Sequence, residues 1–320
     1  MWDIEVEEDH SYVAQGFVNH NSSSKPNMQN IPLYAARRTK EGADGKEIVI
    51  HPGYNVKKLF VPSKPGNIIV NVDIKGAEIR VYTAYAHDEA MIDSLNKGID
   101  THSWVTSMVY KDKLTYDQIQ AGKETDPTIK KWRTNCKKVF FSTLYGGSEY
   151  KIRQLINSTL EYARDLQQSI YTSLPKMRAY VDDVARQVRN RRMLKTYFGR
   201  CRRFRLAHVT SEMMAEAIRE GTNFLIQSTS SDLVLSQLCE IDEHIHELDA
   251  ELLITVHDSL TFEMPDNNVS LLFPFLDHWI TQRVKERFPW LPVDFLYDVE
   301  IGPSYGELKP LKRPKKEATC

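Results

Sequence analysis

Two apolar, strand-like runs, far apart in the sequence and each leading into an aspartate, constrain the fold of this chain most strongly. The first, GNIIVNVDI at residues 66–74, carries Asp73 near its end, and the second, ELLITV from residue 251, leads into a turn with Asp258, which a further short strand, SLTFEMP, follows. Short apolar runs bounded by glycine or polar turn residues are typical of strands in a sheet. The region between them has the spacing of helices, so the pattern predicts an α+β fold in which strands present both acids.

The rest of the chain divides into a strand-like start, a loop-rich region and a series of helices. Residues 1–21 alternate like strands around a turn at Gly16, and residues 22–65 are interrupted by prolines and glycines. Gly146 and Gly147 interrupt one long helical stretch. Helical spacing predicts helices over residues 76–98, 126–174, 176–192, 211–248 and 268–288, and a last strand is expected over 293–302.

Composition excludes several classes of protein. The sequence has no apolar run long enough to span a membrane, and its acidic start, MWDIEVEEDH, lacks the features of a signal peptide. The 4 cysteines lie far apart, which argues against a zinc ribbon or a disulfide framework. We therefore expect a cytoplasmic protein with no membrane partner. Dense basic runs, RQVRNRRMLK and GRCRRFR, favour contact with phosphate backbones, although a solvated helix face would have the same composition.

The two strand-borne acids suggest a shared metal site. An aspartate at a strand end is often only a turn or capping residue, and this alternative stays open for Asp73 and for Asp258 taken singly. Two carboxylates from neighbouring strands, however, can together hold two Mg²⁺ ions for in-line phosphoryl displacement. The pair therefore predicts metal-assisted phosphoryl transfer, provided that the two strands meet.

A stripe of cationic and aromatic side chains points to a nucleotide. Arg133, Lys137, Phe141 and Tyr145 recur every fourth residue, so on a helix they share one face. A face that changes from cationic to aromatic along its length suits a ligand with phosphates at one end and a stacking base at the other. An ordinary solvated face is the alternative.

A second stripe with the same spacing consists of Arg219, Asn223 and Gln227. These side chains carry hydrogen-bonding groups of the kind that reach sugars and base edges in a nucleic-acid groove. This stripe also has a solvated helix face as its alternative, and its occurrence beside paired strand acids favours nucleic-acid binding.

These motifs carry a resemblance to a known family. From Ser22 to about residue 308 the chain resembles the palm and fingers of family A (DNA polymerase I-like) DNA polymerases. The similar segments occur in the family's order: SSSKPNMQNIP, DIKGAEIR, RTNCKKVFFSTLYGG, REGTNFLIQSTSSD and VHDSL. The resemblance implies a palm with an antiparallel sheet, helical fingers, and template-directed addition of dNTPs to the primer end of a primer-template DNA.

The resemblance also implies roles for individual residues. Asp73 and Asp258 would hold two Mg²⁺ ions, and Lys137 would be a proton donor to the leaving pyrophosphate. The residues implied in nucleotide binding are Arg133, Lys137, Phe141, Tyr145, Glu78 and His102, and those implied in DNA binding are Asn27, Gln29, Asn30, Arg219, Asn223, Gln227 and His257.

Departures from the family keep two alternatives open. Ser259 follows Asp258 where the DNA polymerases usually have Glu, and this serine resembles single-subunit RNA polymerases. Glu78 favours DNA synthesis, since the family's Glu crowds a ribose 2′-hydroxyl. A catalytically inactive, polymerase-like DNA-binding subunit is the second alternative, and the joint presence of the acids and the cationic stripe argues against it.

Residues 1–21 resemble the C-terminal end of an intein, a short all-β segment of the Hedgehog/intein type. Such ends combine an Asp and a His, a turn, and a final His-Asn before Ser, Thr or Cys, as do Asp3, His10, His20, Asn21 and Ser22. The Ser22 hydroxyl could accept an acyl group, the Asn21 amide could cyclise and cleave the following bond, and the histidines could move protons.

The expected organisation is therefore an intein fragment over residues 1–21 and a polymerase palm and fingers over residues 22–320, with no thumb and no exonuclease domain. We expect trans-splicing with an N-terminal polymerase and intein fragment, and no polymerase activity in the isolated chain. An internal fragment of a continuous intein-bearing gene is the alternative. The short form of the domain suggests a phage-type enzyme in a bacterial or phage-infected host cell.

Overall fold

The structure is a computed structural model that describes residues 12–14, 17–19, 38–41, 47–51 and 55–313. These residues form two compact units. Unit 1 draws its described residues from 1–75, 233–287 and 295–320, and unit 2 comprises 76–232 and 288–294. Helix α9 (Ser211–His244) contributes residues to both units.

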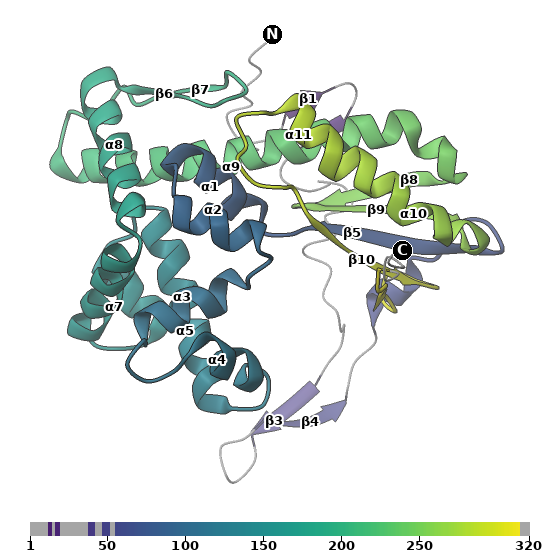
Figure 1. The fold of residues 1–320 in the computed structure, drawn as a ribbon, viewed down its shortest axis with the longest axis horizontal. Helices are drawn as coiled ribbons and strands as arrows, with labels where there is room; N and C mark the ends of the chain where they lie inside the picture. Colours follow the sequence, from purple (N-terminus) through teal and green to yellow (C-terminus); the bar gives the residue numbers. More distant parts are fainter. Residues whose placement is uncertain (1–11, 15–16, 20–37, 42–46, 52–54, 314–320) are drawn as a thin grey trace, which may run out of the picture. The chain divides into compact units, whose positions relative to one another are not determined.

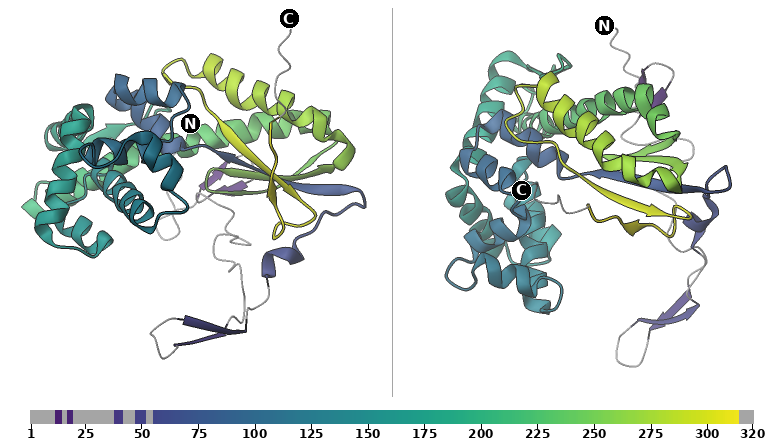
Figure 2. Two further views of the ribbon diagram at one scale, coloured as in Figure 1. Left: turned by 60° about the horizontal axis from the view of Figure 1, so that its bottom comes forward. Right: turned by 45° about the vertical axis from the view of Figure 1, so that its right-hand side comes forward.

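Unit 1 is built on an antiparallel sheet whose strands follow the order β11-β10-β5-β9-β8. The expected strands around both acids are present, and the last strand is shorter than expected. Figures 1 and 2 show β5, β8, β9 and β10 side by side. The strand bounds are β5 Asn67–Ile74, β8 Glu251–Val256, β9 Ser259–Pro265, β10 Tyr297–Gly302 and β11 Lys309–Pro310.

The sheet has one apolar and one polar face because side chains alternate along each strand. On β5, Val70 and Val72 are fully buried, and Phe262 on β9 is buried beside Val70, its partner in the strand register. The intervening residues are polar: Asn71 accepts a hydrogen bond from the Thr261 hydroxyl at 2.8 Å. Asp73 therefore lies on the polar face of the sheet.

Helical segments pack on the apolar face and continue the core of unit 1 (Figure 2). The helix expected over residues 268–288 is present as three consecutive segments: α10 (Val269–Leu276), a π-helix (Asp277–Gln282) and α11 (Arg283–Arg287). π turns are rare, and most of them occur as single turns inside α-helices, as here. The 3-10 turn η3 (Ile245–Leu248) completes the helical stretch expected over residues 211–248.

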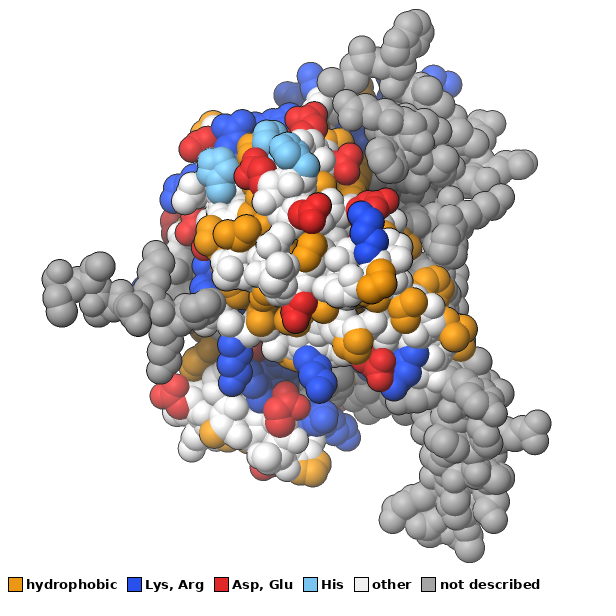
Figure 3. Space-filling view, turned by 90° about the vertical axis from the view of Figure 1, so that its right-hand side faces the viewer, with side chains coloured by type: hydrophobic (Ala, Val, Ile, Leu, Met, Phe, Trp, Pro, Cys, Tyr) orange, Lys and Arg blue, Asp and Glu red, His pale blue; other side chains and the backbone are white. Residues whose placement is uncertain are grey.

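The end of α9 packs against the π-helix through aromatic rings. The rings of His244 and Trp279 stack with their centroids 3.8 Å apart, and His246 and His278 lie next to the same pair. Figure 3 shows histidine side chains gathered on one surface, with acidic and basic side chains interspersed nearby. This packing ties the C-terminal part of α9 to the helices that cover the sheet.

Unit 2 is mainly helical, as expected. Residues 175–191 form one helix close to the expected 176–192, two other expected stretches are each divided into shorter helices, and the helices at 101–109 and 116–122 were not predicted. Residues 76–98 form two helices because His87 takes a left-handed conformation (φ 47°) and Asp88 caps the second helix. Asn157, also left-handed (φ 48°), ends a helix within 126–174 and adds a break beyond Gly146-Gly147. The helix bounds are α1 Ala77–Ala86, α2 Glu89–Asn96, α3 Thr101–Val109, α4 Tyr116–Gly122, α5 Pro127–Leu144, α6 Glu149–Ile156, α7 Leu160–Ser173 and α8 Pro175–Arg191.

Several short strands complete the described structure. β1 (Tyr12–Ala14) and β2 (Phe17–Asn19) pair antiparallel, which confirms the strand pair expected in this part of the chain, and the turn predicted at Gly16 lies outside the described residues. The sequence did not predict the hairpin β3 (Arg38–Glu41) and β4 (Glu47–His51), the turn η2 (Val56–Leu59), or the hairpin β6 (Met193–Lys195) and β7 (Cys201–Arg203). Within the described ranges, no helix combines the length and apolar character needed to cross a membrane.

Helix α5, which carries the cationic and aromatic stripe, depends on a defined N-terminal cap. The Asp126 carboxylate accepts hydrogen bonds from the backbone N–H groups of Thr128 (2.7 Å) and Ile129 (3.2 Å), and Pro127 occupies the first turn. We predict that Asp126→Ala lowers the free energy of unfolding by about 1 kcal/mol. Asp126→Ser should lower it much less, because serine is also a favourable N-cap residue.

Chemical denaturation followed by circular dichroism, with hydrogen exchange at α5, measures this effect. The matched control is Asp112→Ala, which removes an exposed acid from the turn between α3 and α4. An equal loss of stability in the two alanine variants would contradict the capping role of Asp126.

Candidate active site

The structure brings Asp73 and Asp258 together in unit 1. In the β5–β9 register, Asp73 lies opposite Ser259, the residue that follows Asp258. The backbone N–H of Ile74 donates a hydrogen bond to the Asp258 carbonyl at 3.0 Å. The two acids therefore lie at one end of neighbouring strands, although 184 residues separate them in the sequence.

The tight turn between β8 and β9 positions Asp258. His257 in this turn has a left-handed backbone (φ 56°), which lets two residues reverse the chain. The Ser259 hydroxyl donates to the Val256 carbonyl at 2.8 Å, and the residue is 7% exposed. Ser259 therefore stabilises the turn with its side chain, while Asp258 remains at its tip.

The electrostatics of this pair favour a bound cation. Partial burial, followed by the charges of Asp258, Asp298 and Glu300, raises the pKa of Asp73 to about 6. Burial also raises the pKa of Asp258. A raised carboxylate pKa means that the charged form is disfavoured, and a divalent cation between the carboxylates would relieve this cost.

The residues present fit a magnesium site that is completed by substrate. Among the described residues, no three His, Cys, Asp or Glu side chains lie close enough to hold an ion together. Mg²⁺ in enzymes of phosphate transfer is often bound by one or two carboxylates, with waters and substrate phosphates as its other ligands. Asp73 and Asp258 are sufficient for such a site.

In unit 2, helix α5 places the cationic stripe beside the start of α3. Arg133 forms an ion pair with Asp100 at 2.9 Å and donates from Nε to the Ser103 hydroxyl at 3.1 Å. Although partial burial opposes the shift, the Ser103 backbone N–H and the Arg133 guanidinium lower the pKa of Asp100 to about 2. Asp100 therefore stays ionised and fixes the position of Arg133.

His102 lies against the same stripe as a neutral ring. Burial, and then the positive charges of Lys137 and Arg133, lower its pKa to about 4. Its buried Nδ1 has no hydrogen-bond partner in the part of the chain that the structure describes. Such an unsatisfied buried nitrogen, held near two cations, suits a polar group of a bound anion.

The aromatic end of the stripe forms a stacked surface. The ring centroids of Phe141 and Tyr145 are 6.3 Å apart and nearly parallel, and His102 lies 5.6 Å from Phe141. The Tyr145 hydroxyl donates a hydrogen bond to the Glu78 carboxylate. The four stripe residues, His102 and Glu78 are thus gathered on one side of α5.

The stripe on α9 begins beside the C-terminal end of α5. Gly146 has a left-handed backbone (φ 68°), and a Cβ there would lie 3.8 Å from the Cα of Arg219. Asn223 Nδ2 donates to Gln227 Oε1 at 2.9 Å, while Asn223 Oδ1 is buried and has no partner within the described residues. Asn223 and Gln227 are therefore bound to each other, and Asn223 Oδ1 is a hydrogen-bond acceptor that no other described residue uses.

Two features of the site were not anticipated from the sequence. Asp100, which holds Arg133, lies in the segment DTHS at residues 100–103, of which only His102 was predicted to be functional. Asp298 and Glu300 raise the pKa of Asp73, and the alternating acids of YDVE in β10 were the signal that could have revealed them. Both omissions concern acids that become partners only through long-range contacts.

Seven of the predicted site residues lie outside the residues that the structure describes. They are His10, His20, Asn21 and Ser22 from the intein-like segment, and Asn27, Gln29 and Asn30 from the loop that follows. Their roles stay predictions.

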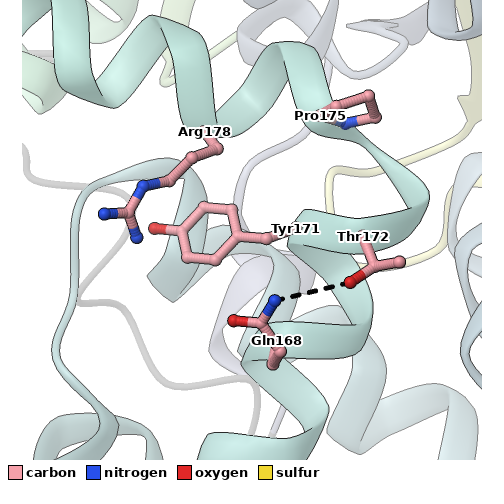
Figure 4. A pocket seen from close by; sticks show the side chains of 5 residues that line it. All are labelled: Gln168, Tyr171, Thr172, Pro175 and Arg178. Atoms are coloured by element: carbon pink, nitrogen blue, oxygen red, sulfur yellow. Dashed lines mark hydrogen bonds between the residues drawn. The ribbon is translucent and has the colours of Figure 1, made fainter.

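Two hollows in unit 2 contain none of the predicted site residues. One, of about 440 Å³, lies at the α7–α8 junction, where the Arg178 guanidinium sits 5.1 Å from the Tyr171 ring centroid (Figure 4). Gln168 and Thr172 also line this hollow, and the Gln168 amide donates a hydrogen bond to the Thr172 hydroxyl at 3.5 Å. The other, of about 490 Å³, includes Trp132 on α5, one residue before Arg133.

Comparison with known proteins assigns the family. The family profile described as DNA polymerase family A matches residues 14–307. The chain belongs to DNA polymerase family A. The match confirms the resemblance found from Ser22 onward, and it begins upstream of that residue, within the segment expected to be intein-like.

Similar proteins include DNA polymerases I from several bacteria. The enzyme of Chloroflexus aurantiacus is 28% identical over 292 residues, which cover 91% of this chain and 28% of that protein. The enzyme of Geobacillus stearothermophilus is 29% identical over 293 residues, which cover 90% of this chain and 30% of that protein. The chain thus spans less than a third of the length of these relatives.

A solved structure shares the fold. The POL domain of Pol1 from M. smegmatis, in complex with DNA primer-template and dNTP, matches with a TM-score of 0.72 at 23% identity. The match covers 93% of this chain and 48% of that one. The α+β polymerase fold predicted for this family A chain is therefore confirmed.

The raised pKa of Asp73 predicts a pH-dependent cost in stability. Its folded-state pKa of about 6 exceeds the ordinary value of 3.8, so the folded protein loses stability as the pH rises through this interval. Without divalent cations, Asp73→Asn should therefore be more stable than the parent by about 1 kcal/mol at pH 8, a value reduced for solvent screening of an exposed group. The gain should vanish near pH 4.

Urea denaturation at both pH values in the presence of a chelator measures this difference. Asp266→Asn, which replaces an exposed acid just beyond β9 at the other end of the sheet, is the control and should show no such gain. A gain in Asp73→Asn that persists unchanged at pH 4 would show that charge repulsion is not its cause.

Proposed function

We propose that this chain supplies the palm and fingers of a template-directed DNA polymerase, which extends a primer with dNTPs by metal-assisted phosphoryl transfer. The observation that carries the proposal is the pairing of Asp73 with Asp258 on the polar side of a sheet, in a family A chain. The cationic and aromatic stripe of α5 supports a nucleotide as the substrate. The proposed setting is the cytoplasm of a bacterial or phage-infected cell.

In the proposed reaction, Asp73 and Asp258 would hold two Mg²⁺ ions. When bound, the ions would supply positive charge that stabilises the phosphoryl-transfer transition state. The carboxylates contribute by fixing the position of the cations, and the closed β8–β9 turn limits the movement of Asp258. Catalysis is then mainly a matter of positioning and charge stabilisation.

The residues of unit 2 orient the triphosphate and the base. Arg133, held by Asp100, and Lys137 provide fixed positive charge for the phosphates, and neutral His102 provides a hydrogen-bonding nitrogen. Lys137 is also the proposed proton donor to the leaving pyrophosphate. The rings of Phe141 and Tyr145 give the sugar and base an apolar surface.

Glu78 favours deoxynucleotides over ribonucleotides in this proposal. Its carboxylate is held by the Tyr145 hydroxyl, at the aromatic end of the stripe. A fixed carboxylate beside the sugar would crowd a 2′-hydroxyl, which argues against the RNA polymerase-like alternative that Ser259 suggested. The buried Ser259 hydroxyl, bound to Val256, supports a structural role for that residue.

The primer-template DNA is proposed to contact Arg219, Asn223 and Gln227 on α9 together with His257. Asn27, Gln29 and Asn30 are proposed to contribute from the upstream loop. Because relatives are about three times longer than the matched region, we propose that other polymerase segments, including a thumb, complete the DNA-binding surface.

A substitution of Asp258 tests whether the site is catalytic. In a polymerase that joins residues 22–320 to a thumb-bearing upstream segment, Asp258→Asn should lower the rate of primer extension about a thousandfold, because the metal contribution is several kcal/mol. Binding of primer-template DNA, measured by fluorescence anisotropy, should change less than about threefold, a negligible difference in free energy.

The control is Asp266→Asn, which replaces an acid beyond the end of β9 and should leave extension unchanged. Equal extension by Asp258→Asn and the parent would overturn the catalytic role of Asp258. No extension by the parent, with DNA binding retained, would support the inactive DNA-binding alternative. Preferential incorporation of rNTPs by the parent would instead support the RNA polymerase-like alternative.

We further propose that residues 1–21 form the C-terminal part of an intein. The Ser22 hydroxyl would first carry the acyl group of the upstream partner. The Asn21 side chain would then cyclise and release Ser22, and His10 and His20 would assist the proton transfers. The β1–β2 pair is compatible with an all-β segment. The family match includes residues 14–21, so the assignment of these residues to the polymerase is the alternative.

Mixing the chain with a partner that carries the upstream polymerase and an intein N-terminal part distinguishes these assignments. Splicing predicts an intact mass equal to the partner's polymerase segment joined to residues 22–320, with residues 1–21 released. Asn21→Ala should prevent release. A folded partner that yields no joined product would assign residues 14–21 to the polymerase.

A further inference from the structure

The strand β10 places an acid directly beside the proposed metal ligand Asp73. Asp298 is the residue paired with Asp73 in the antiparallel β5–β10 register. Side chains at paired positions of neighbouring strands point to the same face, with Cβ atoms about 4.5–5.5 Å apart. Both residues are exposed, whereas their neighbours Val72 and Val299 are buried.

The other neighbour of Asp73 cannot play an equivalent part. Ser259 faces Asp73 from β9, but it is buried and its hydroxyl is bound to the Val256 carbonyl. Negative charge therefore flanks Asp73 from the β10 side, in addition to Asp258 in the β8–β9 turn.

A cation is already paired with this additional acid. Lys75, which follows the end of β5, has its Nζ 2.8 Å from Oδ1 of Asp298. Both side chains are about half exposed, at 45% for Lys75 and 65% for Asp298. A solvent-exposed pair of this kind is weak and can rearrange when a stronger cation is present.

We propose that Asp298 is a positioning residue for the divalent cations of Asp73 and Asp258, and that Lys75 opposes its effect. The proposal rests on the metal-dependent function proposed above. Asp298 would accept hydrogen bonds from the water ligands of an ion, because Mg²⁺ usually keeps several waters and carboxylates in the outer shell orient such ligands. Lys75 competes for the same carboxylate and adds positive charge beside the ion.

The outer-shell assignment agrees with the geometry. Within the described ranges, no three acidic, histidine or cysteine side chains are close enough to share an ion directly. A water molecule between the ion and Asp298 removes the need for a shorter distance, since water-mediated contacts are nearly as favourable as direct ones. The charge of Asp298 then acts on the ion without displacing a ligand.

Binding of Mn²⁺ to the full chain, measured by electron paramagnetic resonance, tests the proposal without an activity assay. Asp298→Asn should weaken Mn²⁺ binding about three- to tenfold. This loss is at or below the smallest losses of metal affinity that are typical when an outer-shell partner is removed, because Asp298 is exposed to solvent. Lys75→Gln should tighten binding about two- to fivefold, because it removes a nearby positive charge. Glu251→Gln, which removes one charge at the far end of the sheet, is the matched control.

The opposite signs of the two effects separate an electrostatic role from a structural one, because damage to the fold would weaken binding in both variants. Asp298→Glu should restore most of the affinity. Mn²⁺ affinity in Asp298→Asn equal to that of Glu251→Gln, or unchanged or weaker binding in Lys75→Gln, would overturn the proposal.

Asp73→Asn and Asp258→Asn distinguish this failure from failure of the proposed function. If these two variants bind Mn²⁺ as the parent does, the metal site itself is wrong. If they lose Mn²⁺ binding while Asp298→Asn matches the control, only the role of Asp298 is wrong.

Discussion

The pairing of β5 with both of its neighbours is the constraint on which the rest of unit 1 depends. Because side chains alternate along a strand, the same register that buries Val70 and Val72 turns Asp73 toward the polar face. A shift of one residue would bury Asp73 and expose the valines. The large apolar cost of that shift fixes the position of the acid, so packing energy, and no local feature of the aspartate, determines where the proposed chemistry occurs.

In unit 2, burial of one face of helix α5 positions the side chains on its other faces, as strand alternation positions Asp73 in unit 1. Its buried side contains Cys136, Val139 and Phe140, and the remaining surface is free to carry charge. Arg133 is held there by an acid from another helix, so its geometry is set before any anion binds. Preorganised charge of this kind costs little reorganisation when a charged ligand arrives. The fold thus supplies rigid supports for side chains that would otherwise be flexible.

The sequence predicted what depends on local pattern and missed what depends on distant contacts. Strand alternation and helical spacing identified β5, β9 and the stripe of α5, because burial imposes these periods on the chain itself. The breaks at His87 and Asn157 were missed because either residue can also occur inside a helix. The partner of Arg133 and the acid opposite Asp73 were missed because strand order and helix packing decide them, and neither is visible in a single sequence. The boundary at Ser22 rests on resemblance to two families, and it stays a prediction, since the family match covers residues 14–307.

The strand order of the sheet also has a consequence for synthesis of the protein on the ribosome. β5 is the central strand, yet both of its partners, β9 and β10, are encoded after nearly all of unit 2. At a translation rate of roughly 5–20 residues per second, β5 therefore waits on the order of ten seconds or longer for its first neighbour. During that interval β5 has no neighbouring strand with which to pair. The helices of unit 2 can already fold, because their contacts are local in the sequence. The emerging chain thus carries an unpaired apolar strand, and the interval before β9 appears is when chaperone protection would matter most.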